Sequence, residues 1–289
     1  MMKRLSFTTT GCWDNTEGFG CASLGLAGIC GNDQNRVLTL PWELEAEELA
    51  GTYEEILAGV EALPRKDRVQ AAIVVFGNAG GENVFLEDLQ KLLRCPMVGG
   101  GAAIDFASGR KGLIPGGKEA AVLLITDDRY DYKTQTKCVH DRILEECVLT
   151  LENPRTAKTI NGEDAVVFYN RKRQALGLTD GDFEHLTLSD KDHVNAHLSI
   201  SDGKLRSGRD LRERMLLRCV DHEKVYDSIR EFYDDPSALV CGCAGLSGIL
   251  DKPLDTVSAG LFLFGEVCMA GGRAEFGNLM LSKLQILPK

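Results

Sequence analysis

The most informative stretch of this chain is VQAAIVVFGNAGGE, residues 69–82. Its first eight residues form a mostly apolar, β-branched run, which is typical of a strand covered on both faces. A small-residue turn follows at 78–81, and residues 82–93 repeat apolar side chains at helical spacing. A buried strand that leads through a turn into a helix predicts a mixed α/β (α+β) fold, with buried mixed sheets flanked by helices.

The same kinds of element continue on both sides of this stretch. Helices are expected at 46–63, 82–93 and 221–233, and strands at 4–9, 97–104, 120–125, 193–200, 215–220, 238–243 and 260–269. Residues 279–287 are expected to form an edge or return strand. Asn153-Pro154 breaks the pattern, so two lobes are predicted, one of residues 1–152 and one of residues 153–289.

The two halves share a pattern of glycines. An offset of 165 residues places Gly80 on Gly245, Gly100 on Gly265 and Gly112 on Gly277. An internal structural duplication would explain this pattern, because repeated units bury their open faces against each other. Chance recurrence among the 31 glycines of the chain is the alternative.

Composition excludes several classes of partner. The 289 residues contain 33 Lys and Arg against 43 Asp and Glu, a formal charge of −10. Such a chain repels nucleic-acid phosphates and anionic lipid, and no run reaches the roughly 18 apolar residues that span a bilayer. The N-terminal residues contain no apolar segment typical of a secretion signal. No two of the ten cysteines are spaced as C-x-x-C. We therefore expect a cytoplasmic protein with free, mostly buried thiols and no metal site.

Two glycine-rich segments are candidate ligand sites. The first contains Asn78, Gly80 and Gly81, where free N–H groups at a helix start would attract a carboxylate or phosphate. A plain strand–helix turn is the alternative there. The second is Gly99-Gly100-Gly101, three glycines in a strand, which mark a bulge or the close approach of a backbone or a ligand. Close packing of the strand on a helix is the alternative there.

Two carboxylates stand near these segments. Asp105 follows the three glycines and is a candidate partner for a ligand amine. Glu266 follows Gly265 inside an otherwise apolar run, and a buried carboxylate is costly unless it is paired. Its partner could be a ligand amine or Arg273, and exposure to solvent is the third alternative.

The cysteines and histidines offer weaker candidates. Cys241-Gly242-Cys243 could ligate a metal or react, but inert core cysteines are the simpler interpretation. His193 and His197 are four residues apart in a segment that looks extended. On a strand they would lie about 13 Å apart, too far to share a metal ion.

Four segments resemble the FIST family, both its N and C regions. They are residues 96–101 (PMVGGG), 159–169 (TINGEDAVVFY), 238–244 (ALVCGCA), and 260–266 (GLFLFGE) followed by Gly277-Asn278. Their order and spacing agree with the family over most of the chain. The departure lies at residues 101–105, where a hydroxyl pair and a Gly-Glu of the family pattern are missing.

The resemblance implies an intracellular sensory protein in signal transduction. Such a protein would bind a small ligand, in particular an amino acid or similar polar metabolite, and act through a separate partner such as a histidine kinase. Some similar proteins are haem-based nitric oxide sensors. By the same resemblance, Gly99, Gly100, Gly265, Glu266 and Asn278 would lie near the ligand cleft.

The predicted function is therefore binding of a small ligand between two lobes, reported by lobe closure and requiring no cofactor. One alternative is a haem-based gas sensor with His140, His193 or His197 as axial ligand. A second is an enzyme with Cys243 as nucleophile, and a third is a partner-binding protein without a ligand. The acidic composition is compatible with a homodimer.

Overall fold

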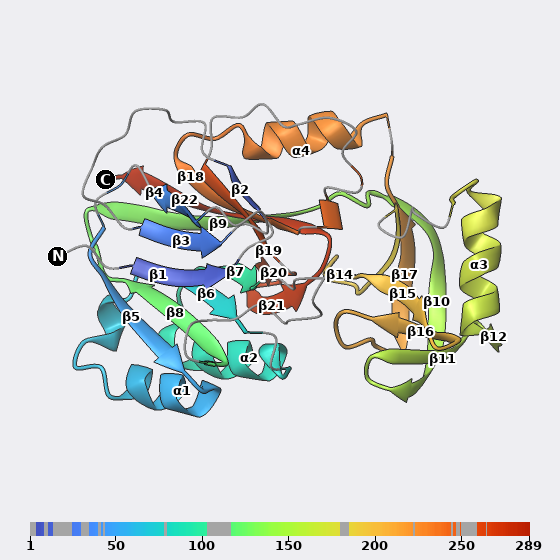
Figure 1. Ribbon diagram of the computed structural model, residues 1–289, viewed down its shortest axis with the longest axis horizontal. Helices are drawn as coiled ribbons and strands as arrows, with labels where there is room; N and C mark the ends of the chain where they lie inside the picture. The colour runs from blue at the N-terminus through green and yellow to red at the C-terminus, as the bar shows by residue number, and fades with distance from the viewer. Residues whose placement is uncertain are drawn as a thin grey trace.

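The structure is a computed structural model. It describes residues 4–8, 11–13, 25–29, 35–39, 42, 44–77, 80–102, 117–179, 185–221, 223–243, 245–246, 249, 259–263 and 265–289. The fold is mixed α+β, as predicted (Figure 1). The helices described are α1 (Tyr53–Glu61), α2 (Glu82–Leu93), α3 (Ala165–Ala175), α4 (Val225–Tyr233) and the short 3-10 helix Lys66–Arg68.

Two sheets face each other in the larger part of the molecule. The first has six strands in the order β21 (Arg273–Gly277), β20 (Glu266–Ala270), β7 (Met97–Gly101), β6 (Ala71–Phe76), β8 (Ala120–Ile125) and β5 (Ala46–Gly51). The second has five strands in the order β2 (Gly11–Trp13), β19 (Ala259–Leu263), β18 (Ala238–Cys243), β22 (Met280–Pro288) and β9 (Tyr130–Cys138). A separate sheet contains β1 (Arg4–Thr8), β3 (Gly25–Ile29) and β4 (Asn35–Thr39).

Helices cover the outer faces of the two facing sheets. The apolar core between the sheets includes Ile73 and Leu123 of the first and Leu239 and Leu284 of the second. The opposite face of the first sheet packs on α1 and α2, and α4 packs on the second sheet (Figure 1). These four layers, helix–sheet–sheet–helix, are called the core lobe below. Because β6 is covered on both faces, its continuous apolar sequence is explained.

A second lobe is built from one continuous stretch of chain. Its eight-stranded sheet follows the order β14 (Asn195–Ala196), β13 (Leu186–Ser189), β17 (Arg214–Cys219), β10 (Arg142–Asn153), β11 (Thr156–Ile160), β16 (Lys204–Ser207) and β15 (Leu198–Ser201), and β12 (Glu163–Asp164) pairs with β11. Helix α3 packs on this sheet through Phe168 and Tyr169. We call residues 142–219 the inserted lobe, because β18 and β22 return to the core lobe. The predicted division between residues 152 and 153 falls near the end of β10, inside the inserted lobe, and does not separate the two lobes.

The core lobe contains the predicted duplication. The segment β5–α1–β6–β7–β8 gives the strand order β5-β8-β6-β7, in which only β6 and β7 are parallel. The segment β9–α4–β18–β19–β22 gives the order β9-β22-β18-β19, in which only β18 and β19 are parallel. The inserted lobe interrupts the second copy between β9 and α4. The glycine offset does not match equivalent strand positions in one case, because Gly100 lies within β7 whereas Gly265 lies between β19 and β20.

Several predicted elements need correction, among them the strand expected at 193–200, which is the two strands β14 and β15. The expected helix 46–63 begins as the edge strand β5, and α1 starts only after Thr52. The side chains of Thr52 and Glu55 form a capping box there, which fixes the helix start at this point. The expected strand 260–269 is two strands, β19 and β20. Residues 280–288 form a central strand of their sheet and not an edge, because β22 pairs with both β18 and β9.

None of the helices in the described part of the chain is long and apolar enough to cross a membrane.

Candidate functional site

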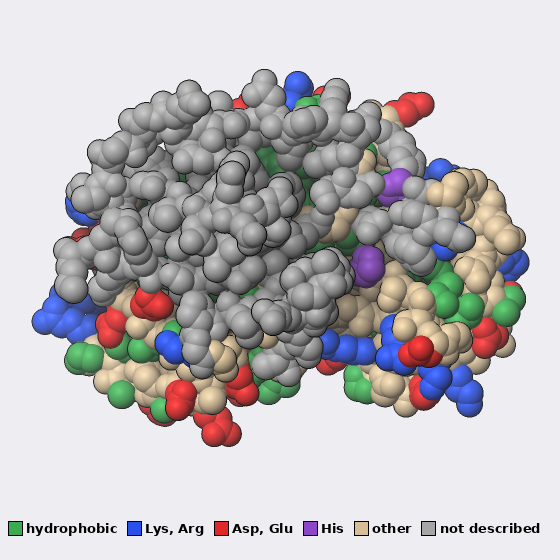
Figure 2. All heavy atoms as spheres, in the orientation of Figure 1, with side chains coloured by type: hydrophobic (Ala, Val, Ile, Leu, Met, Phe, Trp, Pro, Cys, Tyr) green, Lys and Arg blue, Asp and Glu red, His purple; other side chains and the backbone are tan. Residues whose placement is uncertain are grey.

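A pocket of about 300 Å³ lies where the two lobes meet. The core lobe contributes Asn83 and Gln90 from α2, with Arg273 and Glu275 from β21. The inserted lobe contributes Arg209 and Arg212 from the loop between β16 and β17. In the space-filling view, basic side chains gather at the lower edge of this junction (Figure 2). The pocket therefore joins charged groups of both signs from distant parts of the chain.

Helix α2 holds the core-lobe wall in place. Asn83 Oδ1 accepts a hydrogen bond from the Phe276 N–H at 2.8 Å, and Gln90 Oε1 accepts one from the Ala274 N–H at 2.9 Å. Asn83 and Gln90 are seven residues apart, so they lie on the same face of the helix. This face binds the backbone of β21 along its length and fixes where Arg273 and Glu275 project.

The inserted-lobe wall is a loop anchored on both sides of its arginines. The Arg209 N–H donates to Ser207 Oγ at 3.2 Å, and the Leu211 N–H donates to the Pro154 carbonyl at 2.7 Å. Leu211 is buried in the apolar core of this lobe. The loop is therefore well fixed, although it has no regular secondary structure.

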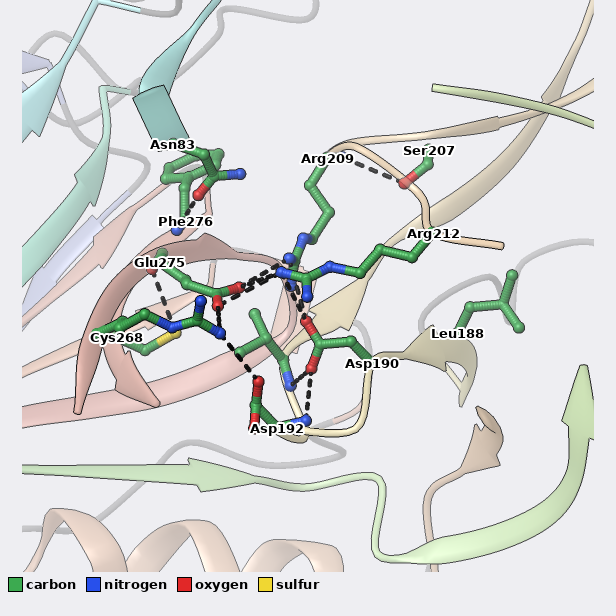
Figure 3. A network of polar contacts seen from close by, with 12 residues as sticks. Asn83, Leu188, Asp190, Asp192, Ser207, Arg209, Arg212, Cys268, Glu275 and Phe276 are labelled. Carbon is green, nitrogen blue, oxygen red and sulfur yellow. Dashed lines mark hydrogen bonds and ion pairs between the residues drawn. The ribbon is translucent and has the colours of Figure 1, made fainter. Parts of the chain in front are cut away.

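An ion-pair network connects the two walls (Figure 3). Arg209 is only 2% exposed, and its Nη2 lies 3.2 Å from Asp190 Oδ2 and 3.0 Å from Glu275 Oε2. Asp190 is fixed by the N–H groups of Asp192 and Val194, both 3.0 Å from its Oδ1. Since Glu275 belongs to the core lobe, Arg209 ties the two lobes together through charge-assisted hydrogen bonds.

The predicted helix-start site is occupied by the chain itself. Gly80 and Gly81 precede α2 as expected, but the Gly80 N–H donates to Glu82 Oε1 at 3.1 Å. The Glu82 carboxylate is buried, and its Oε2 lies 3.2 Å from Arg155 Nη2 of the inserted lobe. A carboxylate is bound at this turn, as the chemistry of the turn predicts, and it comes from the protein.

The glycines of β7 allow strands to approach closely. A Cβ at Gly99 would lie 1.8 Å from the Val74 carbonyl oxygen, and one at Gly100 would lie 2.1 Å from the Gly265 carbonyl oxygen. Gly101 donates its N–H to that same Gly265 oxygen at 3.2 Å. The close contacts of Gly99 and Gly100 are therefore with other strands and the Gly265 backbone, and not with a helix as the alternative had it.

This packing leads to a prediction for Gly99→Ala. The φ of Gly99 is 136°, so alanine would meet both backbone strain and a clash with Val74. We expect a loss of about 2–4 kcal/mol in the free energy of unfolding, measured by urea denaturation. Gly203→Ala is the matched control, because Gly203 has φ 69° and no atom lies within 4 Å of its added Cβ. An equal loss in both variants would contradict the role of close packing.

Glu266 and Cys243 lie side by side in the interior of the core lobe. Glu266 is fully buried, and its Oε2 accepts a hydrogen bond from the Met280 N–H at 3.0 Å. Its Oε1 has no hydrogen-bond partner among the described residues. Burial raises the pKa of the Glu266 carboxyl well above its usual range, and burial also raises the pKa of the adjacent Cys243 thiol. Burial thus favours the protonated form of Glu266 and keeps Cys243 as a thiol, without the thiolate that a nucleophile needs.

Asn278 and Arg273 lie where the core lobe meets the inserted lobe. The Asn278 N–H donates to the Asn195 carbonyl at 3.0 Å, and Asn278 Oδ1 accepts from the His197 N–H at 3.3 Å. Arg273 pairs with Asp192 at 3.4 Å and with Glu275, and does not contact Glu266 in any recorded ion pair. Of the predicted site residues, Arg273 lines the inter-lobe pocket. Asn78 and Asp105 lie outside the described residues.

The histidines considered for haem contact protein groups. His140 Nδ1 is 3.1 Å from Asn195 Nδ2, and His193 Nδ1 contacts Arg218 Nη2. Within the described ranges, no group of three or more His, Cys, Asp or Glu side chains is arranged to hold a metal ion.

Most of the pocket could not be predicted from the sequence. The predicted site residues do not include Arg209, Arg212, Glu275, Asn83 or Gln90. One signal was present, because residues 207–215 read SGRDLRERM and hold three arginines within six positions. A charge run of this kind is usually a solvated surface, and only the fold places it against β21.

Comparison with known families and curated proteins found no match to this chain. Fold and site thus define a two-lobed mixed α+β protein with a charged pocket between its lobes.

Proposed function

We propose that this chain is a sensory protein that binds an amino acid or a similar small polar metabolite in the inter-lobe pocket. One observation carries the proposal: the pocket lies between the lobes and is lined by charges of both signs. A zwitterion needs donors for its carboxylate and an acceptor for its amine. Arg209, Arg212 and Arg273 supply the donors, and Glu87 supplies the acceptor.

A ligand in this position would couple binding to the arrangement of the lobes. It would contact α2 and β21 on one side and the loop of Arg209 and Arg212 on the other. If the ligand binds one arrangement of the lobes more tightly than the other, the equilibrium between the two arrangements shifts toward the tighter-binding one. The largest possible shift is the ratio of the ligand's affinities for the two arrangements. The change would then be read by a separate signalling protein, for which the resemblance to the FIST family suggests a histidine kinase.

The proposed setting is the cytoplasm. The seven cysteines whose side chains the structure describes are free, and six of them are buried. Free thiols persist in a reducing compartment. The acidic composition and the resemblance to intracellular sensory proteins also support this setting.

The test is thermal unfolding of the purified protein against amino acids, small organic acids, nucleotides and haem. A ligand at a hundredfold excess over its Kd adds about 2.7 kcal/mol to the stability of the native state. We expect one small polar metabolite to raise the Tm, and we expect Arg212→Ala to weaken its binding at least tenfold.

Arg206→Ala is the matched control for Arg212→Ala. Arg206 lies in the same lobe, is 47% exposed against 44% for Arg212, and is likewise ion-paired, to Asp202. Its replacement should leave ligand affinity unchanged. The protein is first refolded from denaturant, which removes any bound molecules. If no compound then raises its Tm, the proposal is contradicted. A shift with haem alone would also contradict it.

A further inference from the structure

Three arginines surround the carboxylate of Glu275. Nη2 of Arg209 lies 3.0 Å and Nη2 of Arg212 3.3 Å from Glu275 Oε2 (Figure 3). Nη2 of Arg273 lies 3.6 Å from Glu275 Oε1. Two of the arginines come from the inserted lobe and one from the core lobe. We call these three side chains the arginine cradle.

The cradle has more donors than its present partners use. A guanidinium carries five N–H donors. Arg209 uses Nη2 for Asp190 and Glu275, whereas its buried Nε and Nη1 have no hydrogen-bond partner among the described residues. Leaving such donors buried and unpaired costs about 1–3 kcal/mol each. A side chain that lines the pocket thus keeps unused capacity for an anionic group.

The other acidic groups at the pocket are already paired. Glu87 lies 3.0 Å from Lys91, and Asp210 lies 3.0 Å from Arg155. Asp190 is held by Arg209, and Asp192 lies 3.4 Å from Arg273. Glu275 is therefore the carboxylate that competes most directly with a ligand for the cradle.

Resting on the proposed function, we propose that the ligand is a small dicarboxylate, with or without an amine, and that Glu275 is its internal competitor. One carboxylate would take over the N–H groups of Arg209 and Arg212, and the other would bind Arg273 on the opposite wall. Paired N–H groups of arginine match the two oxygens of a carboxylate. The volume of about 300 Å³ suits a molecule of this size, at the lower end of small-ligand pockets.

The proposal makes opposite predictions for two residues of the network. Glu275→Gln removes the competing charge and keeps the shape, so affinity for succinate should rise about tenfold. Arg212→Ala removes a cradle donor, so affinity should fall at least tenfold, and Arg206→Ala should change nothing. If Glu275→Gln is unfolded by circular dichroism, Glu275→Asp provides the second test, because its shorter carboxylate reaches the arginines less well.

Isothermal titration calorimetry with succinate, L-glutamate, L-glutamine, L-lysine and inorganic phosphate decides among the outcomes. We expect succinate and L-glutamate to bind at least tenfold more tightly than L-glutamine and L-lysine. Equal binding of L-glutamine, or no rise in affinity with Glu275→Gln, overturns the dicarboxylate inference and leaves the proposed function standing. Binding of phosphate alone overturns it in favour of a phosphate site. Failure of all five probes, when a compound of the wider panel does bind, overturns this inference alone, and failure of both sets overturns the proposed function as well.

Discussion

Replacing Arg209 by methionine is expected to lower the free energy of unfolding by about 3–5 kcal/mol. The substitution removes the cation that lies 3.2 Å from Asp190 and 3.0 Å from Glu275, and both of these carboxylates are buried. After the substitution Glu275 keeps Arg212 and Arg273, but the nearest remaining cation to Asp190 in any ion pair is Arg212 at 3.8 Å, so its buried charge is poorly compensated. Urea denaturation of Arg209→Met against the unmodified protein measures the loss.

A double variant separates lost charge from lost packing. Adding Glu275→Gln to Arg209→Met removes one of the two carboxylate charges that have lost Arg209, so part of the stability should return. Arg206→Met is the exposed control and should cost no more than about 1 kcal/mol, because its pair with Asp202 is exposed. A loss below 1 kcal/mol for Arg209→Met would show that the inter-lobe network does not hold the lobes together.

Replacing Glu266 by glutamine is expected to stabilise the protein at neutral pH. The pKa of Glu266 is raised in the folded state by burial, so the folded protein holds a proton that the unfolded chain releases. The free energy of unfolding is therefore unaffected by Glu266 below about pH 4.3, the pKa of a glutamate in the unfolded chain. Above that pH it declines by up to about 1.4 kcal/mol per pH unit, until the pH reaches the pKa of Glu266 in the folded protein. Glutamine removes this decline and can still accept the Met280 N–H.

The measurement is the free energy of unfolding of both proteins between pH 5 and pH 9. This whole range lies above the usual pKa of a glutamate carboxyl, about 4.3. The two curves should separate as pH rises, with the glutamine variant above. Glu47→Gln serves as the exposed control and should follow the unmodified protein. Parallel curves would mean that Glu266 is ionised in the folded state, and the account of a neutral buried acid would be wrong.

Much of the core lobe could be predicted from local sequence. Residues 71–76 and 82–93 carry their patterns without help from distant partners, since one is apolar throughout and the other is amphipathic. The helix expected at 46–63 failed at its start because pairing with β8 makes residues 46–51 a strand. Strand pairing is a tertiary effect, and it overrides the helical spacing seen in one segment.

The pocket could not be predicted from sequence, for a related reason. Arg209 and Glu275 are 66 residues apart, and only the return of the chain from the inserted lobe to β20 and β21 brings them together. The glycines and the isolated Glu266 were predicted to be site residues because they interrupt apolar segments. In the fold, these breaks serve close strand packing and a buried acid, and the pocket is formed by polar residues that look like ordinary surface.

The most direct test of the inter-lobe site is a crystal structure of the protein with the compound that raises its Tm most. The account predicts ligand density between the lobes, with its anionic groups within hydrogen-bond distance of Arg209, Arg212 and Arg273. Density beside Gly99–Gly101 and Glu266, or on a surface away from α2 and β21, would contradict it.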